Sequence, residues 1–345
     1  MKVSVIITVY NLEHYIEETL QSVLAQTYEN LEIIVVNDCS IDNSETIILK
    51  YRNQIRYVKP SQNSGVLLAT CAGLEVATGD IVTFLDGDDI WHPSKIEEII
   101  NLYQENPEYV LVSHDYEYID EHGKMIYPAD STQETLKNLS NENNFYEINV
   151  VMQKAIQIPE GKVWLGSAFS INLKKFQIES FLNWVKTLPE PTLVYQDWPL
   201  ATFVMAMNNG KFGYVNKKLF KYRLHESNHS GGTKMTTNRA KNVAKKGLFT
   251  SLAILEILKK YSYNFNELDY NKISNHRNFM VHEYQFLLAL YDRKIMKSYN
   301  LFNILKNNYW TKKQKQKNFI RFIVFSLFGS KFFELKYLFS KLRKN

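Results

Sequence analysis

The chain has 345 residues, of which 45% are hydrophobic and 22% charged, and its formal net charge is +5. This length allows two or three domains, and the composition is that of a globular protein, which excludes a disordered or fibrous chain. Two cysteines, Cys39 and Cys71, are too few for a disulfide framework and predict free thiols in a reducing compartment. No segment has the roughly 18 consecutive apolar residues of a membrane-spanning helix, and we expect no signal peptide.

The first ~115 residues alternate between apolar runs and segments of helical period. This alternation predicts βαβ units around a largely parallel sheet. We expect strands over Val3–Val9, Leu31–Val36, Ile55–Val58, Ile81–Leu85 and Tyr109–His114, separated by helices over residues 12–24, from residue 42, over Gly65–Ala77 and over Lys95–Tyr103.

The pattern beyond the fifth strand is less regular. Residues 123–161 are polar and Asn-rich, which predicts a long loop or an insertion. Regular structure is expected to resume over Val163–Ile171, with a helix over Leu193–Met207 and a strand over Gly213–Tyr222. From residue 242 the pattern is helical, with one face formed by Leu248, Leu252, Leu255 and Leu258 and a second helix over His276–Tyr291.

An acidic turn, Asp86-Gly87-Asp88-Asp89, directly follows the apolar run Ile81–Leu85. Carboxylates are the ligands that Mg²⁺ and Mn²⁺ prefer, often together with the oxygens of a substrate phosphate. Asp86 and Asp88 point the same way if the strand continues, so one can hold a metal while the other binds a hydroxyl. Asp and Gly also favour ordinary turns, and this alternative stays open from the turn alone.

Three polar clusters follow the ends of predicted parallel strands, namely Tyr10-Asn11, Asp38 and the acidic turn. The carboxyl ends of parallel strands are where open α/β sheets bind ligands, so we expect these clusters to converge. A nucleotide suits such a crevice. Neither a G-x-G-x-x-G fingerprint nor a P-loop is present, which argues against dinucleotide and P-loop sites.

Five motifs in chain order resemble glycosyltransferase family 2, whose members are inverting enzymes of the GT-A fold. They are Thr8-Val9-Tyr10-Asn11, Val36-Asn37-Asp38-Cys39-Ser40, Gln62-Asn63-Ser64-Gly65, Asp86-Gly87-Asp88-Asp89 and Pro93-Ser94-Lys95-Ile96. The resemblance covers roughly residues 1–230. It implies an α/β GT-A fold, with a mostly parallel central sheet flanked by helices and a C-terminal helical extension.

The resemblance also implies roles for individual residues. Thr8, Tyr10 and Asp38 surround the base of a nucleotide-diphosphate sugar, Asp86 contacts the ribose, and Asn11, Asn63 and Gly87 belong to the same donor site. Asp88 binds the divalent metal, Mn²⁺ or Mg²⁺, with His225 as a second ligand or phosphate contact, and Arg223 neutralises the diphosphate. Asp197 is the catalytic base that takes the proton of the acceptor hydroxyl.

Structural alternatives stay open at four of these positions. Tyr10 can be a rim aromatic that only packs, and His225 can be a structural histidine. Asp38 can cap a helix that begins near Ser40-Ile41-Asp42, and Asp197 can cap the helix that contains Leu200.

The chain departs from the family pattern at two places. Gln196 precedes the base where the family usually has Glu, which leaves the base intact but removes a carboxylate. Ala69-Thr70-Cys71 replaces the usual Ala-Arg-Asn, and the missing Arg often touches the nucleotide, so a uridine donor is favoured but not fixed. Cys71 is expected to be a small packed residue.

The acceptor side is indicated only by position. Residues that lie where family members shape the acceptor or sugar pocket are Trp164, Gly166, Ser167 and Gln196, with Trp91 and Trp198 beside the metal and the base. Aromatic side chains stack on pyranose rings, and they are equally at home in a core.

The basic residues gather at the C-terminal end. From Lys306 onward there are eleven Lys or Arg and one acid, Glu334, so the first 305 residues carry a net charge of about −5. A basic amphipathic helix is typical of a membrane-surface or protein-binding element, and a solvated helix is the plain alternative. Nucleic acid is not an expected partner because no binding module is present.

These observations predict two regions, a catalytic domain over 1–235 (donor half about 1–115, acceptor half about 116–235) and a helical region over 236–345. The expected function is metal-dependent transfer of a sugar, hexosyl or N-acetylhexosaminyl, from a UDP-sugar to a saccharide acceptor. By family analogy, that acceptor is a lipid-linked precursor of a bacterial surface polysaccharide, on the cytoplasmic face of the membrane. The alternatives are a nucleotidyltransferase, whose Gly-rich loop is missing here, and a non-catalytic binder of nucleotide-sugar or glycan.

Overall fold

The computed structural model describes residues 1–127, 145–146, 166–208, 211–226, 228, 236–308 and 312–329. These residues belong to two compact units. The first comprises Met1–Leu224 and Glu256–Ile273, and the second comprises His225–Leu255 and Ser274–Asn345. The predicted division between a catalytic domain and a helical region at residue 235 stays a prediction.

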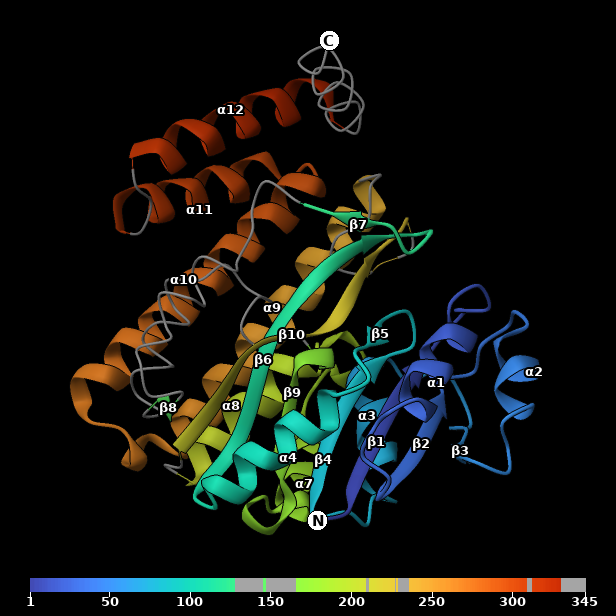
Figure 1. The fold of residues 1–345 in the computed structure, drawn as a ribbon. Coiled ribbons are helices and arrows are strands. Elements are labelled where there is room, and N and C mark those ends of the chain that lie inside the picture. Colours follow the sequence, from blue (N-terminus) through green and yellow to red (C-terminus); the bar gives the residue numbers. More distant parts are fainter. Residues whose placement is uncertain are drawn as a thin grey trace. The chain divides into compact units, whose positions relative to one another are not determined.

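One mixed β-sheet forms the centre of the first unit (Figure 1). Its described strands are β1 (Val3–Val9), β2 (Leu31–Asn37), β3 (Arg56–Val58), β4 (Ile81–Asp86), β5 (Ile90–Trp91), β6 (Tyr109–Asp120), β7 (Met125–Ile126), β8 (Phe145–Tyr146), β9 (Phe169–Asn172) and β10 (Lys211–Leu224). Their order is β3-β2-β1-β4-β9-β6-β10-β5, with β7 on β6 and β8 on β10. The predicted parallel sheet is confirmed for β3, β2, β1 and β4. Strand β9 lies between β4 and β6 and is antiparallel to both.

Helices cover both faces of the sheet because the apolar strands alternate their side chains between two buried faces. On one face, Val5 and Ile7 of β1 share a core with α1 (Ile16–Leu24), α2 (Ser44–Leu49) and α4 (Lys95–Glu105). On the other face, α3 (Val66–Leu74) packs so closely that a Cβ on Gly73 would lie 2.5 Å from the Ile6 side chain. The strands are therefore near-continuous apolar runs.

The rest of the first unit is built around a short 3-10 helix, Gly166–Ala168, and two α-helices, α7 (Ile178–Thr187) and α8 (Asp197–Asn208). An aromatic cluster joins these helices, in which Phe203 packs edge-on against Phe181 and Tyr261. The helix expected from Leu193 begins at Asp197, after a short turn over Pro191–Leu193. Most of the Asn-rich segment, and Trp164 with it, lies outside the described residues.

The second unit is helical. Its helices are α11 (Ile295–Asn308), α12 (Lys312–Phe328) and most of α9 (Thr237–Lys260) and α10 (Glu267–Tyr291). A core of Ala244, Phe286, Leu290, Phe302 and Phe325 holds them together. Of the predicted apolar face of α9, Leu258 is buried as expected, whereas Leu252 is exposed; Ala244 and Ile254 are buried in addition.

Helices α9 and α10 approach closely where Gly247 faces a tyrosine. A Cβ on Gly247 would lie 2.2 Å from the ring of Tyr284, so a larger residue would require that ring to move. Within the described ranges, no helix combines the length and the apolar composition that a membrane crossing needs.

Candidate active site

The acidic turn sits at the carboxyl end of β4, in the middle of the parallel part of the sheet. Register places Asp86 beside Thr8 of β1, and Val9 beside Asn37 of β2, so the three predicted polar clusters do converge on one edge. The turn is fixed by its backbone: the Gly87 N–H donates to the Thr8 carbonyl at 3.0 Å. A Cβ on Gly87 would lie 3.0 Å from that same oxygen, so the close approach favours glycine.

Asp86 is surrounded by polar groups. Its backbone N–H donates to the Ser167 hydroxyl at 3.0 Å, and the Gln196 amide donates to its carboxylate at 3.1 Å. Burial raises the pKa of Asp86 to about 7, and the negative charges of Asp88 and Asp197 add to the rise, while hydrogen bonds from Thr8 and Gln196 oppose it. Asp88 and Asp197 therefore both lie close enough to influence Asp86.

Asp89, the last residue of the turn, forms hydrogen bonds with several elements that surround the site. It is fully buried, and its carboxylate accepts the Ser167 hydroxyl at 2.6 Å and the Arg223 backbone N–H at 3.0 Å. Its carbonyl accepts the Thr19 hydroxyl of α1 at 2.8 Å. Burial raises the pKa of Asp89 well above its ordinary value, followed by the charges of Asp88 and Asp86. Asp89 therefore connects β4, β10, α1 and the 3-10 helix.

Ser167, predicted as an acceptor-pocket residue, is buried behind the acidic turn. Its carbonyl accepts the Lys95 ammonium at 2.6 Å. That ammonium lies 3.8 Å from the centre of the Trp91 ring, and both side chains are buried. Burial lowers the pKa of Lys95 well below its ordinary value, against the attraction of Asp89. Trp91 thus packs in the core, as the structural alternative for this residue supposed.

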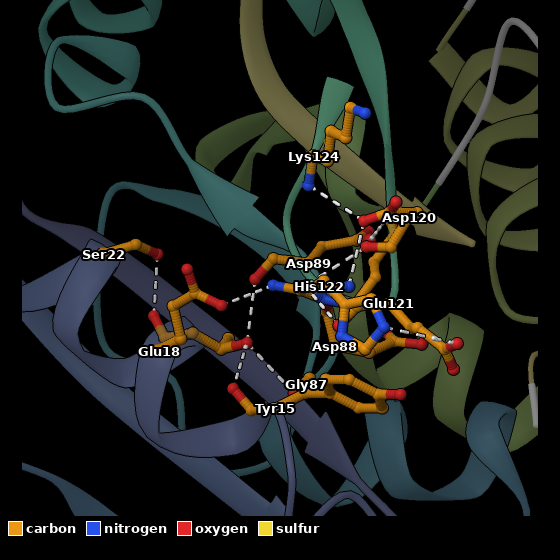
Figure 2. A network of polar contacts seen from close by, with 12 residues as sticks. Tyr15, Glu18, Ser22, Gly87, Asp88, Asp89, Asp120, Glu121, His122 and Lys124 are labelled. Carbon is orange, nitrogen blue, oxygen red and sulfur yellow. Dashed lines mark hydrogen bonds and ion pairs between the residues drawn. The ribbon is translucent and has the colours of Figure 1, made fainter. Parts of the chain in front are cut away.

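Arg223 is 1% exposed and its guanidinium is bound by the protein itself. Nε donates to the Asp88 carbonyl at 2.9 Å, and Nη2 forms an ion pair with Glu18 at 2.5 Å. Nη1 donates to the carbonyls of Asp120 and Glu121, at 3.4 and 3.3 Å. Figure 2 labels the partners of these contacts, Glu18, Asp88, Asp120 and Glu121. The arginine predicted to neutralise a diphosphate thus supports the acidic turn, and a contact with phosphate stays a prediction.

The two positions that depart from the family pattern touch each other. The Thr70 hydroxyl of α3 hydrogen-bonds to the Gln196 side-chain carbonyl, although 126 residues separate them. Both are buried, and the amide end of Gln196 is directed at Asp86. A Cβ on Gly166 would lie 2.7 Å from the Gln196 amide nitrogen, so glycine leaves room for it. The neutral side chains of Gln196 and Thr70 are therefore bonded to each other beside Asp86. The family pattern has the charged residues Glu and Arg at these two positions.

Asp197 begins α8, directly after Gln196. The Leu200 N–H donates to the Gln196 carbonyl, so Gln196 stands at the cap position and Asp197 is the first residue of the helix. The Asp197 carboxylate accepts the N–H of the next residue, Trp198, at 2.9 Å, which is not the bond of an N-cap side chain. The predicted alternative, that Asp197 only caps this helix, is therefore not confirmed. The same carboxylate is partly exposed, and its charge reaches Asp86. Trp198 is buried.

The nucleotide side of the edge combines one exposed ring with a fixed loop. Tyr10 is 39% exposed, and Asn11 has a φ of 54° and accepts the Ile41 N–H at 2.8 Å. Asp38 is buried, and its carboxylate accepts the N–H groups of Ser64 and Gly65 at 2.8 Å each. The Asn63 amide donates to the Asp38 carbonyl at 3.0 Å. Asp38 therefore fixes the loop before α3, not the helix after Ser40, whose backbone N–H is accepted by Asn37.

The donor set for a metal is small. Among the described residues, no group of three or more His, Cys, Asp or Glu side chains is arranged to hold a metal ion. The half-buried Asp88, with Asp86 near it, fits a Mg²⁺ or Mn²⁺ ion that is held by one or two carboxylates and by substrate phosphates. His225 belongs to the second unit, and its role as a ligand stays a prediction.

Thr70, Lys95, Asp89 and Glu18 were not predicted as site residues. Thr70 and Lys95 lie in helices among apolar neighbours, where a single polar residue gives no local signal of the partner it binds. Asp89 belonged to the recognised turn, and its complete burial shows which of the three aspartates is structural. Both cysteines are free, and burial raises the pKa of Cys71 to about 12, as expected of a packed thiol.

Solved structures with the same arrangement are GT-A glycosyltransferases. S. aureus TarS in complex with UDP-GlcNAc aligns with a TM-score of 0.53 and 16% identity, over 90% of this chain and 91% of that one. The mannosyltransferase PcManGT from Pyrobaculum calidifontis, in complex with GDP-Man and Mn²⁺, aligns with a TM-score of 0.52 and 15% identity, over 95% and 87% of the two chains. The fold is therefore the GT-A fold of glycosyltransferases, with C-terminal helices.

The sequence comparisons point to one family. Residues 4–162, a little under half of the chain, match the model described as Glycosyl transferase family 2. An uncharacterised glycosyltransferase of Nostoc sp. is 42% identical over 136 residues, which are 39% of this chain and 42% of that protein. Glycosyltransferase GlyA of Streptococcus pneumoniae is 29% identical over 238 residues, 66% of this chain and 31% of that protein. The chain thus spans less than half the length of these relatives.

Proposed function

We propose that this protein is a metal-dependent, inverting glycosyltransferase that moves a hexosyl or N-acetylhexosaminyl group from a nucleotide-diphosphate sugar to a hydroxyl of a saccharide acceptor. The observation that carries this proposal is the meeting of Asp86, Asp88 and Asp197 at the carboxyl edge of the parallel strands. Such an edge is the general ligand site of open α/β sheets. Clustered carboxylates whose environments differ suit both ligand binding and proton transfer.

The donor site is supported by residues on β1 and β4. Tyr10 presents an exposed ring at the end of β1, on which a base can stack. Asp86 offers a carboxylate for the ribose, and Asp88 one for a divalent cation. The neighbours bind UDP-GlcNAc and GDP-Man, which are both nucleoside-diphosphate sugars and differ in the base and in the sugar. A UDP-sugar remains our first candidate for this chain.

The transfer requires one proton acceptor beside the attacking hydroxyl. Asp197 is partly exposed at the first turn of α8, where it takes the proton from the acceptor oxygen as that oxygen forms its bond to C1 of the sugar. The bond between C1 and the diphosphate oxygen breaks in the same displacement, so the configuration at C1 inverts. A bound Mg²⁺ or Mn²⁺ offsets the charge that develops on the leaving diphosphate.

The acceptor in this proposal is a lipid-linked precursor of a bacterial surface polysaccharide. This part rests on the family alone. Gly166 lies close to the Gln196 amide, and this neighbourhood is where we expect the acceptor or the sugar to bind. Trp164, which lies outside the described residues, is a further candidate for that pocket.

The experiment that tests the donor site is calorimetric titration of the protein with UDP, GDP, CDP and dTDP, each with and without Mn²⁺. The expected result is metal-dependent binding of one diphosphate, with UDP first. Asp88→Asn is expected to lose the metal dependence, whereas Asp80→Asn, at the opposite end of β4 and partnered by Lys174 and the Lys2 backbone, is the matched control. A folded protein that binds none of the four diphosphates would refute the donor site.

A further inference from the structure

Helices α11 and α12 present an unusually apolar outer surface. Both helices carry large exposed side chains. We call six of them the α11–α12 face: Met296 and Tyr299 of α11 and Phe319, Ile320, Ile323 and Leu327 of α12; Ile295 and Ile304 of α11 are exposed as well. Leu327 is 68% and Ile320 60% exposed. The four residues of α12 recur at helical spacing and therefore lie along one side of it.

The opposite side of α12 already forms the core of the second unit. Phe325 is 1% exposed and packs against Tyr291 of α10, and Phe322 packs against Phe302 of α11. Phe319 also contacts Phe302, so it lies at the edge of this core, whereas Ile320, Ile323 and Leu327 are exposed on the outer side of α12. One side of α12 packs in the core, and its exposed side is apolar as well. Such an exposed apolar patch indicates a second contact surface.

The charge of this region has a single sign. Between residues 293 and 329 the sequence contains nine Lys or Arg and no Asp or Glu. Lys297, Lys306 and Lys312 are exposed among the described residues of these helices. Cations beside exposed Phe, Ile and Leu are the composition of helices that lie in the interface of an anionic bilayer, with cations at the phosphates and apolar side chains below.

We propose that the α11–α12 face binds the surface of an anionic lipid bilayer, with Phe319, Ile320, Ile323 and Leu327 inserted at the level of the headgroups. This proposal rests on the proposed function, because an enzyme with a lipid-linked acceptor must work at a membrane surface. It assigns the membrane contact to α11 and α12, before residue 330. An acidic protein or a second copy of this chain would be a different occupant, and the experiment separates these outcomes.

The experiment is flotation of the purified full chain with vesicles of phosphatidylcholine alone or of phosphatidylcholine mixed with phosphatidylglycerol. The protein is expected to float only with the anionic vesicles, and less so as salt is raised, because salt screens exposed charges. Leu327→Asp is expected to lower the partition coefficient at least tenfold, and Lys312→Glu about fivefold or more. Leu268→Asp and Lys259→Glu, at exposed positions of α10 and α9, are the matched controls and should float as the parent does.

Three outcomes would overturn the inference. The first is a folded protein that floats with neither vesicle, and the second is flotation that Leu327→Asp and Lys312→Glu leave unchanged. The third is a concentration-dependent oligomer, measured by light scattering, that Leu327→Asp disperses in the absence of any vesicle binding. Titration of the same samples with UDP and Mn²⁺ reports the donor site independently, so failure of the membrane face and failure of the proposed function are distinguishable.

Discussion

The edge of the sheet and the α11–α12 face use charge in opposite ways. At the edge, Asp86 and Asp89 accept hydrogen bonds from neighbouring protein groups, and burial together with nearby carboxylates raises their pKa values. On the α11–α12 face, lysines and arginines lie next to exposed apolar side chains and no acidic residue is present between residues 293 and 329. A small ligand is recognised by prearranged groups, whereas a wide surface is recognised by composition. Single substitutions should therefore act strongly at the edge and additively on the face.

The largest effect is expected from Asp197→Asn. Loss of the proton acceptor should lower kcat by roughly 10²–10⁴-fold, while calorimetry shows that the nucleotide diphosphate still binds. Glu190→Gln, in the turn just before α8, is the control and should keep full turnover. If Asp197→Asn keeps parental turnover, Asp197 is not the proton acceptor.

Arg223→Met tests whether the buried guanidinium supports the turn. We expect the free energy of unfolding to fall by roughly 3 kcal/mol, because the carbonyls of Asp88, Asp120 and Glu121 lose their shared donor and Glu18 loses its partner. Urea denaturation provides the measurement. Lys218→Met, at an exposed position of the same strand, should change stability by less than about 0.5 kcal/mol. A purely phosphate-binding arginine would instead leave stability unchanged and weaken diphosphate binding.

Thr70→Val removes the hydroxyl that binds Gln196 while keeping the shape of the side chain. The Gln196 carbonyl then stays buried without this donor, which should cost roughly 1–3 kcal/mol of stability. We also expect kcat to fall, since Gln196 positions Asp86 and precedes Asp197. Thr70→Ser restores the hydroxyl and should recover both quantities. Equal behaviour of the Val and Ser variants would show that the hydroxyl contributes nothing.

A smaller, pH-dependent effect is expected at the far end of β1 and β2. Burial alone would raise the pKa of Glu32, but hydrogen bonds from Lys2, Ser4 and Thr78 hold it at about 2, below the ordinary 4.5. Because the folded pKa is the lower one, the stabilisation is complete above about pH 4.5 and is lost as the pH falls toward 2. Its size is roughly 1–2 kcal/mol after solvent screening.

Urea denaturation at pH 6 and at pH 3 measures this contribution. Glu32→Gln should flatten the part of the pH dependence that belongs to Glu32, and Glu75→Gln, at the exposed end of α3, should leave it as in the parent. An unaltered pH dependence in Glu32→Gln would contradict the assignment.

Much of the sheet was predictable because its signals are local. The runs Val3–Val9, Leu31–Val36 and Ile81–Leu85 are apolar and bounded by turn residues, and they form neighbouring parallel strands. The rule that ligands bind beyond the carboxyl ends then brings Tyr10, Asp38 and Asp86 together without further information. Strand β9 was less accessible, because its insertion between β4 and β6 joins segments that are far apart in sequence.

The sequence by itself determined the parallel core, the order of the motifs and the uniformly positive charge of α11 and α12, since each depends on residues that are close together in the chain. Only the tertiary structure decided which polar side chains form their hydrogen bonds with other groups of the protein. It assigned Arg223 to the carbonyl of Asp88, Asp38 to the loop before α3, and Thr70 to Gln196 across 126 residues. A buried polar group must find a partner wherever the fold supplies one, and no local pattern encodes that choice.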